Sequence, residues 1–271
     1  MVVPGIVLFL TGLAYYRFTQ DAPDGNFSEL RARGELPPVD RDNGAGQSFM
    51  AAIKDVRVWA LFVVYAACFG VELTINNIAA IYFFDQFDLD LATAGLIAGL
   101  FGLMNLFART LGGVFSDLFA RGSGLKGRVR WLFVAMLCEG IALMGFAQMQ
   151  TLAVAIAIML IFSLFVQMAE GATFGVVPFV NPRALGAVAG IVGAGGNAGA
   201  VAAGFLFRSE ALTYQQGLFY LGVTVTVISL ATWAIRFSPA AEEEAGAAYR
   251  EADSRRDYRS NATPPDALAT R

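Results

Sequence analysis

Long apolar stretches separated by short polar segments run along most of this chain. A helix needs about twenty mostly apolar residues to cross the ~30 Å hydrocarbon layer of a bilayer. Seven stretches are about that long, and they lie at residues 1–18, 57–84, 92–119, 131–149, 152–179, 184–208 and 216–237. The pattern therefore predicts an all-α membrane protein with seven membrane-spanning helices.

The polar segments divide these helices into groups. Residues 19–56 combine charges of both signs with several prolines and glycines, which is typical of a linker. Residues 238–271 contain acidic and basic runs and too few large apolar side chains to pack. We expect one helix at 1–18, a cytoplasmic linker at 19–56, a six-helix bundle at 57–237 and a disordered cytoplasmic tail at 238–271.

The basic residues predict which ends of the helices face the cytoplasm, because short loops rich in Lys and Arg stay there. Most of the 19 lysines and arginines fall at alternate ends of the predicted helices. They lie in 17–57, in 120–130, at Arg183 and from Arg236 onward, whereas 85–91, 149–151 and 209–215 contain none. We expect a multi-pass protein of the inner (plasma) membrane with a cytoplasmic C-terminus.

Composition narrows the possible chemistry. Only 15% of the residues are charged and 56% are hydrophobic, whereas globular proteins average about 25% charged. The sequence has no histidine, which excludes Ser-His-Asp hydrolysis and His-ligated zinc. Cys68 and Cys138 lie in apolar runs, so they form neither a disulfide framework nor a CxxC metal site. We expect a lipid bilayer as partner, and no enzyme activity, cofactor, metal or nucleic acid.

Arg109 is the sharpest candidate for function. It lies roughly 25 Å from one end of its predicted helix and 12 Å from the other, and a charge at such a depth costs about 2.5–3.5 kcal/mol. A planar guanidinium matches a planar oxyanion, so Arg109 is either an anion site or a structural partner of a neighbouring glutamate. Glu139 and Glu170, also inside predicted helices, are each either proton carriers or such partners.

A second group of candidates lies on one face of the predicted helix 57–84. Tyr65, Phe69, Glu72 and Asn76 are spaced four, three and four residues apart, which aligns them as an aromatic and polar stripe. An aromatic pair at this spacing is also common in simple packing. The adjacent carboxylate and amide indicate that this face looks into the bundle or a wet cavity.

The predicted helix 184–208 contains a run rich in glycine. Pairs of glycines four residues apart allow neighbouring backbones to approach closely, and packing explains most of them. Asn197 is a polar amide at the centre of the run, where it can donate a hydrogen bond to a small anion.

Four segments carry a resemblance to known proteins. The sequence Gly113-x-x-x-Asp117, followed by Arg121, resembles a loop motif of the major facilitator superfamily, in which the acid forms a contact that breaks as the bundle moves. Phe101 to Gly113, Phe69 to Asn77, and the run Gly193-Ala-Gly-Gly-Asn197-Ala-Gly199 resemble the nitrate/nitrite porters of that superfamily. The resemblance covers the chain up to about Phe237.

That resemblance implies a fold and a site. The family has two six-helix halves joined by a cytoplasmic linker, and the anion lies between them, held by one arginine from each half. The chain would then be the C-terminal half plus the end of the sixth helix, with an N-terminal half missing or supplied by a partner chain. By resemblance, the anion would contact Arg109, Tyr65, Phe69, Asn197, Gly193, Gly195, Gly196 and Gly199, with Glu72, Asn76 and Glu170 as coupling or pairing residues, and Gly113, Asp117 and Arg121 as a gating loop.

We therefore expect a secondary transporter of nitrate or nitrite that serves nitrate assimilation, truncated at its N-terminus. Its coupling is either nitrite exchange or proton symport, the latter through Glu72 and Glu170. Two alternatives remain: a half-transporter that acts only with a partner half, or a porter of another small anion. A tight pair of Arg109 with Glu72, Glu139 or Glu170, without open space beside it, would argue against an anion site.

Overall fold

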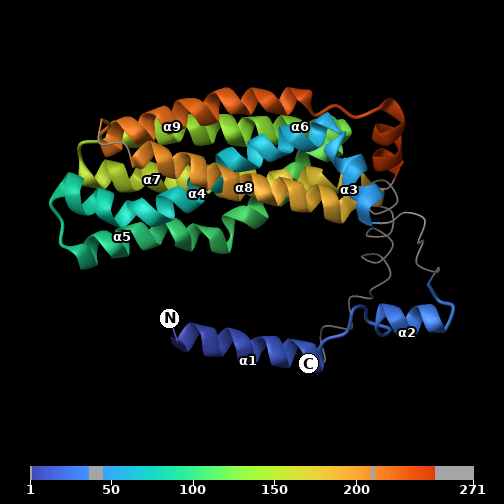
Figure 1. Cartoon of the computed structure of the whole chain (residues 1–271). Helices are drawn as coiled ribbons and strands as arrows, with labels where there is room; N and C mark the ends of the chain where they lie inside the picture. The colour runs from blue at the N-terminus through green and yellow to red at the C-terminus, as the bar shows by residue number, and fades with distance from the viewer. Residues whose placement is uncertain (1, 37–44, 209–210, 248–271) are drawn as a thin grey trace, which may run out of the picture. The chain divides into compact units, whose positions relative to one another are not determined.

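The computed structural model describes residues 2–36, 45–208 and 211–247, and these ranges are helical apart from short turns (Figure 1). The chain divides into two compact units, Met1–Gly44 and Ala45–Arg271.

The first unit contains α1 (Val2–Phe18) and α2 (Phe27–Ala32). α1 corresponds to the helix predicted at 1–18, and it carries exposed apolar side chains such as Leu8 and Phe9. At 17 residues it is about 25 Å long, slightly shorter than a bilayer's hydrocarbon layer. A helix that is apolar all round requires lipid or further helices around it.

The second unit contains the candidate site. Its elements are α3 (Ala45–Ile53), α4 (Val56–Phe87), α5 (Leu91–Leu103), η1 (Met104–Leu106), α6 (Ala108–Ala147), α7 (Leu152–Val176), η2 (Val177–Phe179), η3 (Pro182–Ala184), α8 (Leu185–Phe207), α9 (Tyr214–Ile228) and η4 (Ser229–Ala234). Five segments in the described residues are long and apolar enough to cross a membrane. One of them, Leu91–Ala147, has 57 residues and folds back on itself.

The reversal in α6 occurs at Gly124, whose backbone leaves the helical region with φ of 62°. Residues on the two sides then meet in antiparallel order: the indole N–H of Trp131 donates to the Gly112 carbonyl at 3.1 Å. The second unit thus has the six predicted spans. The loop expected at 120–130 is wrong, because glycine at 124 and 127 lets the two helices approach almost up to the turn.

The predicted helix 92–119 is also interrupted, which the sequence pattern did not indicate. α5 ends at Leu103, the single 3₁₀ turn η1 follows, and Phe107 has a non-helical φ of −132° before α6 begins. The amide of Phe107 donates to the Met104 carbonyl at 3.3 Å, which is the tighter 3₁₀ pattern. The break places its own residues beside α4.

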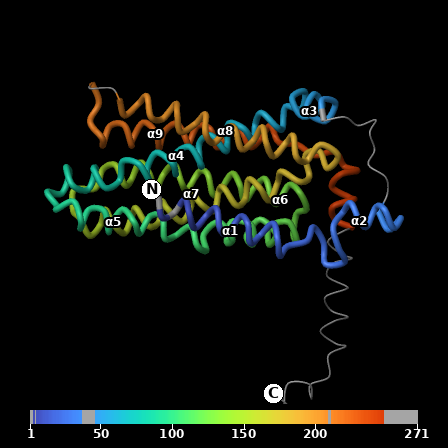
Figure 2. Tube along the Cα trace, turned by 60° about the horizontal axis from the view of Figure 1, so that its bottom comes forward, coloured from blue at the N-terminus to red at the C-terminus, as the bar shows by residue number. Residues whose placement is uncertain are grey.

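Helices α4 and α8 run side by side, and α6 packs against α7 and α9 (Figures 1 and 2). Glycines make the closest approaches. A Cβ added at Gly70 would lie 2.6 Å from the Gly199 carbonyl carbon, and one at Gly112 would lie 2.1 Å from the Met168 oxygen. In the glycine run of α8, only Gly195, Gly196 and Gly199 lie against a neighbouring helix, and the other four glycines have no atom within 4 Å of an added Cβ. The prediction that packing explains most of that run is therefore wrong for the described residues.

The end of the second unit departs from the prediction for 238–271. Residues 239–247 form a short helix, although we expected this stretch to be disordered. Ser238 Oγ accepts from the Ala241 amide at 3.2 Å, and Glu242 accepts from the amides of Leu125 and Lys126 at 2.9 and 3.1 Å. These hydrogen bonds hold residues 239–247 in place, a segment with too few large apolar side chains to be held by packing. Residues 248–271 lie outside the described residues.

Candidate anion-binding site

Arg109 occupies the first turn of α6, immediately after the helix break. Its Nη2 donates to Oε2 of Glu72 on α4 at 2.9 Å and also to Oε2 of Glu170 on α7. Both glutamates are buried, whereas 39% of the arginine side chain is exposed. The pairing of Arg109 with neighbouring glutamates, which we predicted as the alternative to an anion site, is therefore present. The guanidinium also keeps an exposed side.

Asn105 is a member of this cluster that the sequence analysis missed. It lies in η1, and its Nδ2 donates to Oε1 of Glu72 at 2.8 Å. A signal was available, because Asn105 precedes Arg109 by one helical turn and is the other polar residue in that stretch. Glu72 is thus held through both oxygens.

The predicted aromatic pair borders the arginine. The Arg109 guanidinium carbon lies 5.9 Å from the ring centroid of Phe69, within the range of a cation–π contact. Tyr65 stacks on Phe69 with centroids 5.1 Å apart, and Phe174 of α7 meets Tyr65 edge-on at the same distance. Phe174 was not anticipated. The two rings provide a flat apolar surface next to a cation.

The glycines of α8 have different surroundings. A Cβ at Gly196 would lie 2.4 Å from Phe69 Cδ1, so this glycine lies against the aromatic pair. At Gly195 and Gly199 a Cβ would meet backbone oxygens of α4 at 2.4 and 2.0 Å, so these two serve helix packing. Gly193 has no atom within 4 Å of such a position. Only Gly196 contacts the rings beside Arg109.

Asn197 lies on the open side of α8. Its side chain is exposed, and its Nδ2 lies 3.5 Å from the Gly193 carbonyl on its own helix. Asn76 is likewise exposed, with Oδ1 near Gly102 of α5. No hydrogen bond among the described residues joins either amide to the Arg109 cluster.

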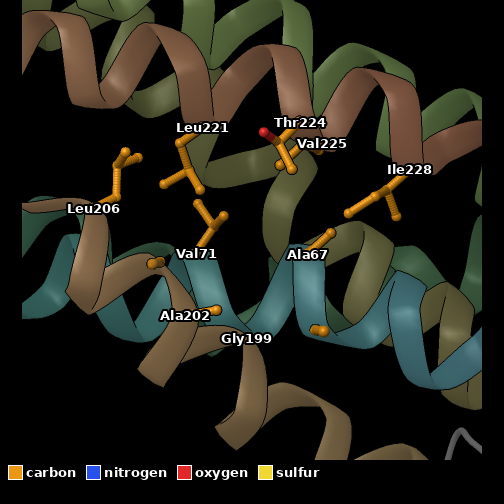
Figure 3. Close-up of a pocket in the computed structure, with 11 residues that line it drawn as sticks. Ala67, Val71, Gly199, Ala202, Leu206, Leu221, Thr224, Val225 and Ile228 are labelled. Atoms are coloured by element: carbon orange, nitrogen blue, oxygen red, sulfur yellow. The ribbon is translucent and has the colours of Figure 1, made fainter.

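A separate cavity of about 310 Å³ lies between α4, α8 and α9 (Figure 3). Its walls are apolar, and Gly199 borders it together with Val71 and Leu221. The one hydroxyl among the lining side chains, that of Thr224, donates to the Tyr220 carbonyl at 2.8 Å. This cavity offers no charge or free donor to an anion.

The three residues of the predicted gating loop lie in helix α6, and only Asp117 of them joins a polar cluster near the reversal. Arg128 donates from Nη2 to Asp117 and from Nη1 to Ser116 Oγ at 3.1 Å, and its guanidinium lies over the Phe179 ring. The partner of Asp117 is thus Arg128. Arg121 is exposed one turn further on, and the Gly113 backbone faces Gly171 of α7.

Comparison with known proteins gives strong matches. The chain is 43% identical over 236 residues to "High affinity nitrate transporter 2.5" of Arabidopsis thaliana and 37% identical over 250 residues to "Nitrate transporter 2.2" of Chlamydomonas reinhardtii. It is 40% identical over 150 residues to "Nitrate/nitrite transporter NrtP" of Picosynechococcus, covering 54% of this chain. The chain belongs to the nitrate transporter family of the major facilitator superfamily.

The matches cover most of this chain but only part of each relative. The first two cover 87% of this chain but 46% and 47% of the relatives, so the chain spans about half the length of the curated relatives it matches. No family model and no solved structure matches it. The predicted resemblance and the all-helical membrane fold of a half-transporter are confirmed. The site residues stay predictions.

Proposed function

We propose that this chain forms one wall of a nitrate/nitrite secondary transporter, in which two helix bundles alternate access to a central anion. The observation that carries the proposal is the partly open guanidinium of Arg109, held over Phe69 at a helix break. Its N–H groups match the oxygens of a planar anion, and the ring gives a flat surface for it.

The charges around Arg109 favour proton symport over nitrite exchange. Glu72 and Glu170 both bond to the one guanidinium, so the cluster is net negative when both are ionised. A negative cluster repels nitrate. A proton on either carboxylate removes that charge and frees an N–H group of Arg109. Nitrate would thus bind together with a proton.

Other residues of the site act around this centre. Tyr65 and Phe69 would face the anion, and Asn197 would donate from α8, where Gly193 leaves room and Gly196 lies against the two rings. Gly195 and Gly199 would act through the packing of α8 on α4. By family resemblance, a second arginine comes from the other half, which this chain does not include.

The cluster at the reversal of α6 is the proposed gate. Asp117 is 58% exposed on its side chain while its partner Arg128 is buried. An exposed carboxylate beside a fixed cation can form a contact with the other half that breaks when the bundles rock.

The test is nitrate uptake into proteoliposomes by this chain combined with its missing half. We expect Arg109→Lys to abolish uptake, because an ammonium does not reproduce the fork of donors. Arg130→Lys, on an exposed arginine near the turn, is the matched control and should keep wild-type uptake. Wild-type nitrate affinity in Arg109→Lys would overturn the assignment.

A second candidate is favoured by the half-length match: a half-transporter that acts only with a separately encoded partner. Uptake measured with and without the supplied half tests whether this chain acts alone. The DNA upstream separates the remaining cases, because a frame encoding more helices and a second arginine indicates a longer transporter. Competition by nitrite and chlorate tests whether another small anion is preferred.

A further inference from the structure

The membrane span that carries Arg109 is interrupted just before that residue. α5 gives way to the 3₁₀ turn η1 at Met104, and regular helix resumes at Ala108. No proline explains the interruption, since residues 101–113 contain none. A 3₁₀ stretch inside a helix often marks a functional hinge.

One buried carboxylate bridges this break. Glu72 Oε1 accepts from Asn105 at 2.8 Å, and Asn105 belongs to η1. Glu72 Oε2 accepts from Arg109 at 2.9 Å, and Arg109 belongs to α6. We call these three residues the Glu72 clamp. The 3₁₀ turn of the break and the first turn of α6 are therefore both tied to one side chain of α4.

The charged groups near the clamp are few. α7 contributes Glu170, the returning part of α6 contributes the buried Glu139, and α4 itself contributes Cys68 one turn away. The other elements packed against α4 are α3, α5, α8, α9 and η4, and none of them contains Asp, Glu, Lys, Arg, His or Cys. Arg109 is thus the single cation at Glu72 in the described residues.

We propose that Glu72 is the proton-controlled clamp of this break and that Asn105 is its positioning residue. The inference rests on the proposed function, because it assigns the coupling proton to Glu72. A proton forms an O–H bond at Oε2 and occupies the oxygen that Arg109 uses. The bond from Arg109 to Glu72 is lost, and one N–H of Nη2 becomes available to the anion while the other still donates to Glu170.

The second half of the step concerns the hinge. With that bond lost, α6 is no longer tied to Glu72, whereas Asn105 still donates to Oε1 and keeps η1 in place. The angle between α5 and α6 at the break can then change, so protonation of Glu72 allows α6 to move. Deprotonation restores the ionised carboxylate, which again accepts from Asn105 in η1 and from Arg109 in α6.

The test measures the distance across the break in this chain reconstituted in lipid, without nitrate. Spin labels on Leu96→Cys and Val114→Cys sit on exposed positions before and after the break, in a Cys138→Ala background. We expect the distance distribution to shift as the pH is lowered. Glu72→Gln should show the low-pH distribution at every pH, and Asn105→Ala should lose the high-pH distribution.

Glu139→Gln is the matched control, since Glu139 is equally buried but bonds to neither Asn105 nor Arg109 in the structure. It should keep the wild-type pH response. A wild-type distance that does not change with pH, or a Glu72→Gln variant that still responds, would overturn the proposal. Because nitrate takes no part, a failure of the proposed transport activity is detected separately, by the uptake assay.

Discussion

Two buried glutamates of the bundle differ in what surrounds them. Glu72 bonds to Arg109 and Asn105, whereas neither oxygen of Glu139 has a hydrogen-bond partner among the described residues. A buried polar group without a partner costs about 1–3 kcal/mol, and removing one member of a buried ion pair costs about 3–5 kcal/mol. The two positions should therefore respond in opposite directions to an apolar substitution.

We expect Glu139→Leu to raise the free energy of unfolding by about 1–3 kcal/mol, because a leucine needs no partner there. Glu72→Leu is the comparison and should lower it, since Arg109 loses an acceptor. Thermal unfolding in detergent, followed by tryptophan fluorescence, measures both. If the free energy of unfolding fell as much in Glu139→Leu as in Glu72→Leu, Glu139 would have a hydrogen-bond partner in the folded protein.

At this scale the sequence predicts positions better than partners. The depth of Arg109 and the stripe through Tyr65, Phe69 and Glu72 follow from helical spacing alone. Which glutamate pairs with Arg109 depends on how far α4 and α7 rotate about their axes, and spacing within one helix does not determine that rotation. Asn197 illustrates the limit, because its exposed position on α8 was not evident from its place in the glycine run.

Among the helices, the contact between α4 and α8 depends most clearly on missing side chains. Gly199 lies where a Cβ would be 2.0 Å from the Ala66 carbonyl oxygen, whereas Gly190 on the same helix has no atom within 4 Å. The same substitution should therefore have opposite effects at the two positions.

We expect Gly199→Ala to destabilise the bundle by about 1–3 kcal/mol through overpacking. Gly190→Ala is the matched control and should be neutral or stabilising by up to about 1 kcal/mol, because alanine favours helix. Thermal unfolding of both variants in the same detergent measures the difference. Equal stability of the two variants would indicate that α4 and α8 separate without cost.

The elements that sequence periodicity missed are the irregular ones. The break at 104–107 contains neither proline nor glycine, so its local sequence resembles continuous helix. It is stabilised by bonds from Asn105 and Arg109 to Glu72, more than thirty residues earlier in the chain. The turn at Gly124 is shorter than the polar segment 120–130. Polar residues there indicate exposure to solvent, but the backbone hydrogen bonds of the helix continue through most of that segment.

For the molecule as a whole, the distribution of charge predicts orientation. The turn of α6 at Gly124 lies among Arg121, Lys126 and Arg130, whereas the turn between α6 and α7 contains no basic residue. The two turns are separated by the second part of α6, roughly 35 Å long at 1.5 Å per residue. They therefore lie on opposite sides of a bilayer, and the positive-inside rule assigns the turn at Gly124 to the cytoplasm.

Single cysteines test that assignment in intact cells with a membrane-impermeant maleimide. Ser123 and Gln150 are exposed residues at the two turns, while Cys68 is buried. In a Cys138→Ala background we expect Gln150→Cys to react in intact cells and Ser123→Cys to react only after permeabilisation. The reverse pattern would place the C-terminal segment outside. In that case the cluster of Asp117 and Arg128 would gate the external side of the anion site, and the direction in which a proton reaches Glu72 would also be reversed.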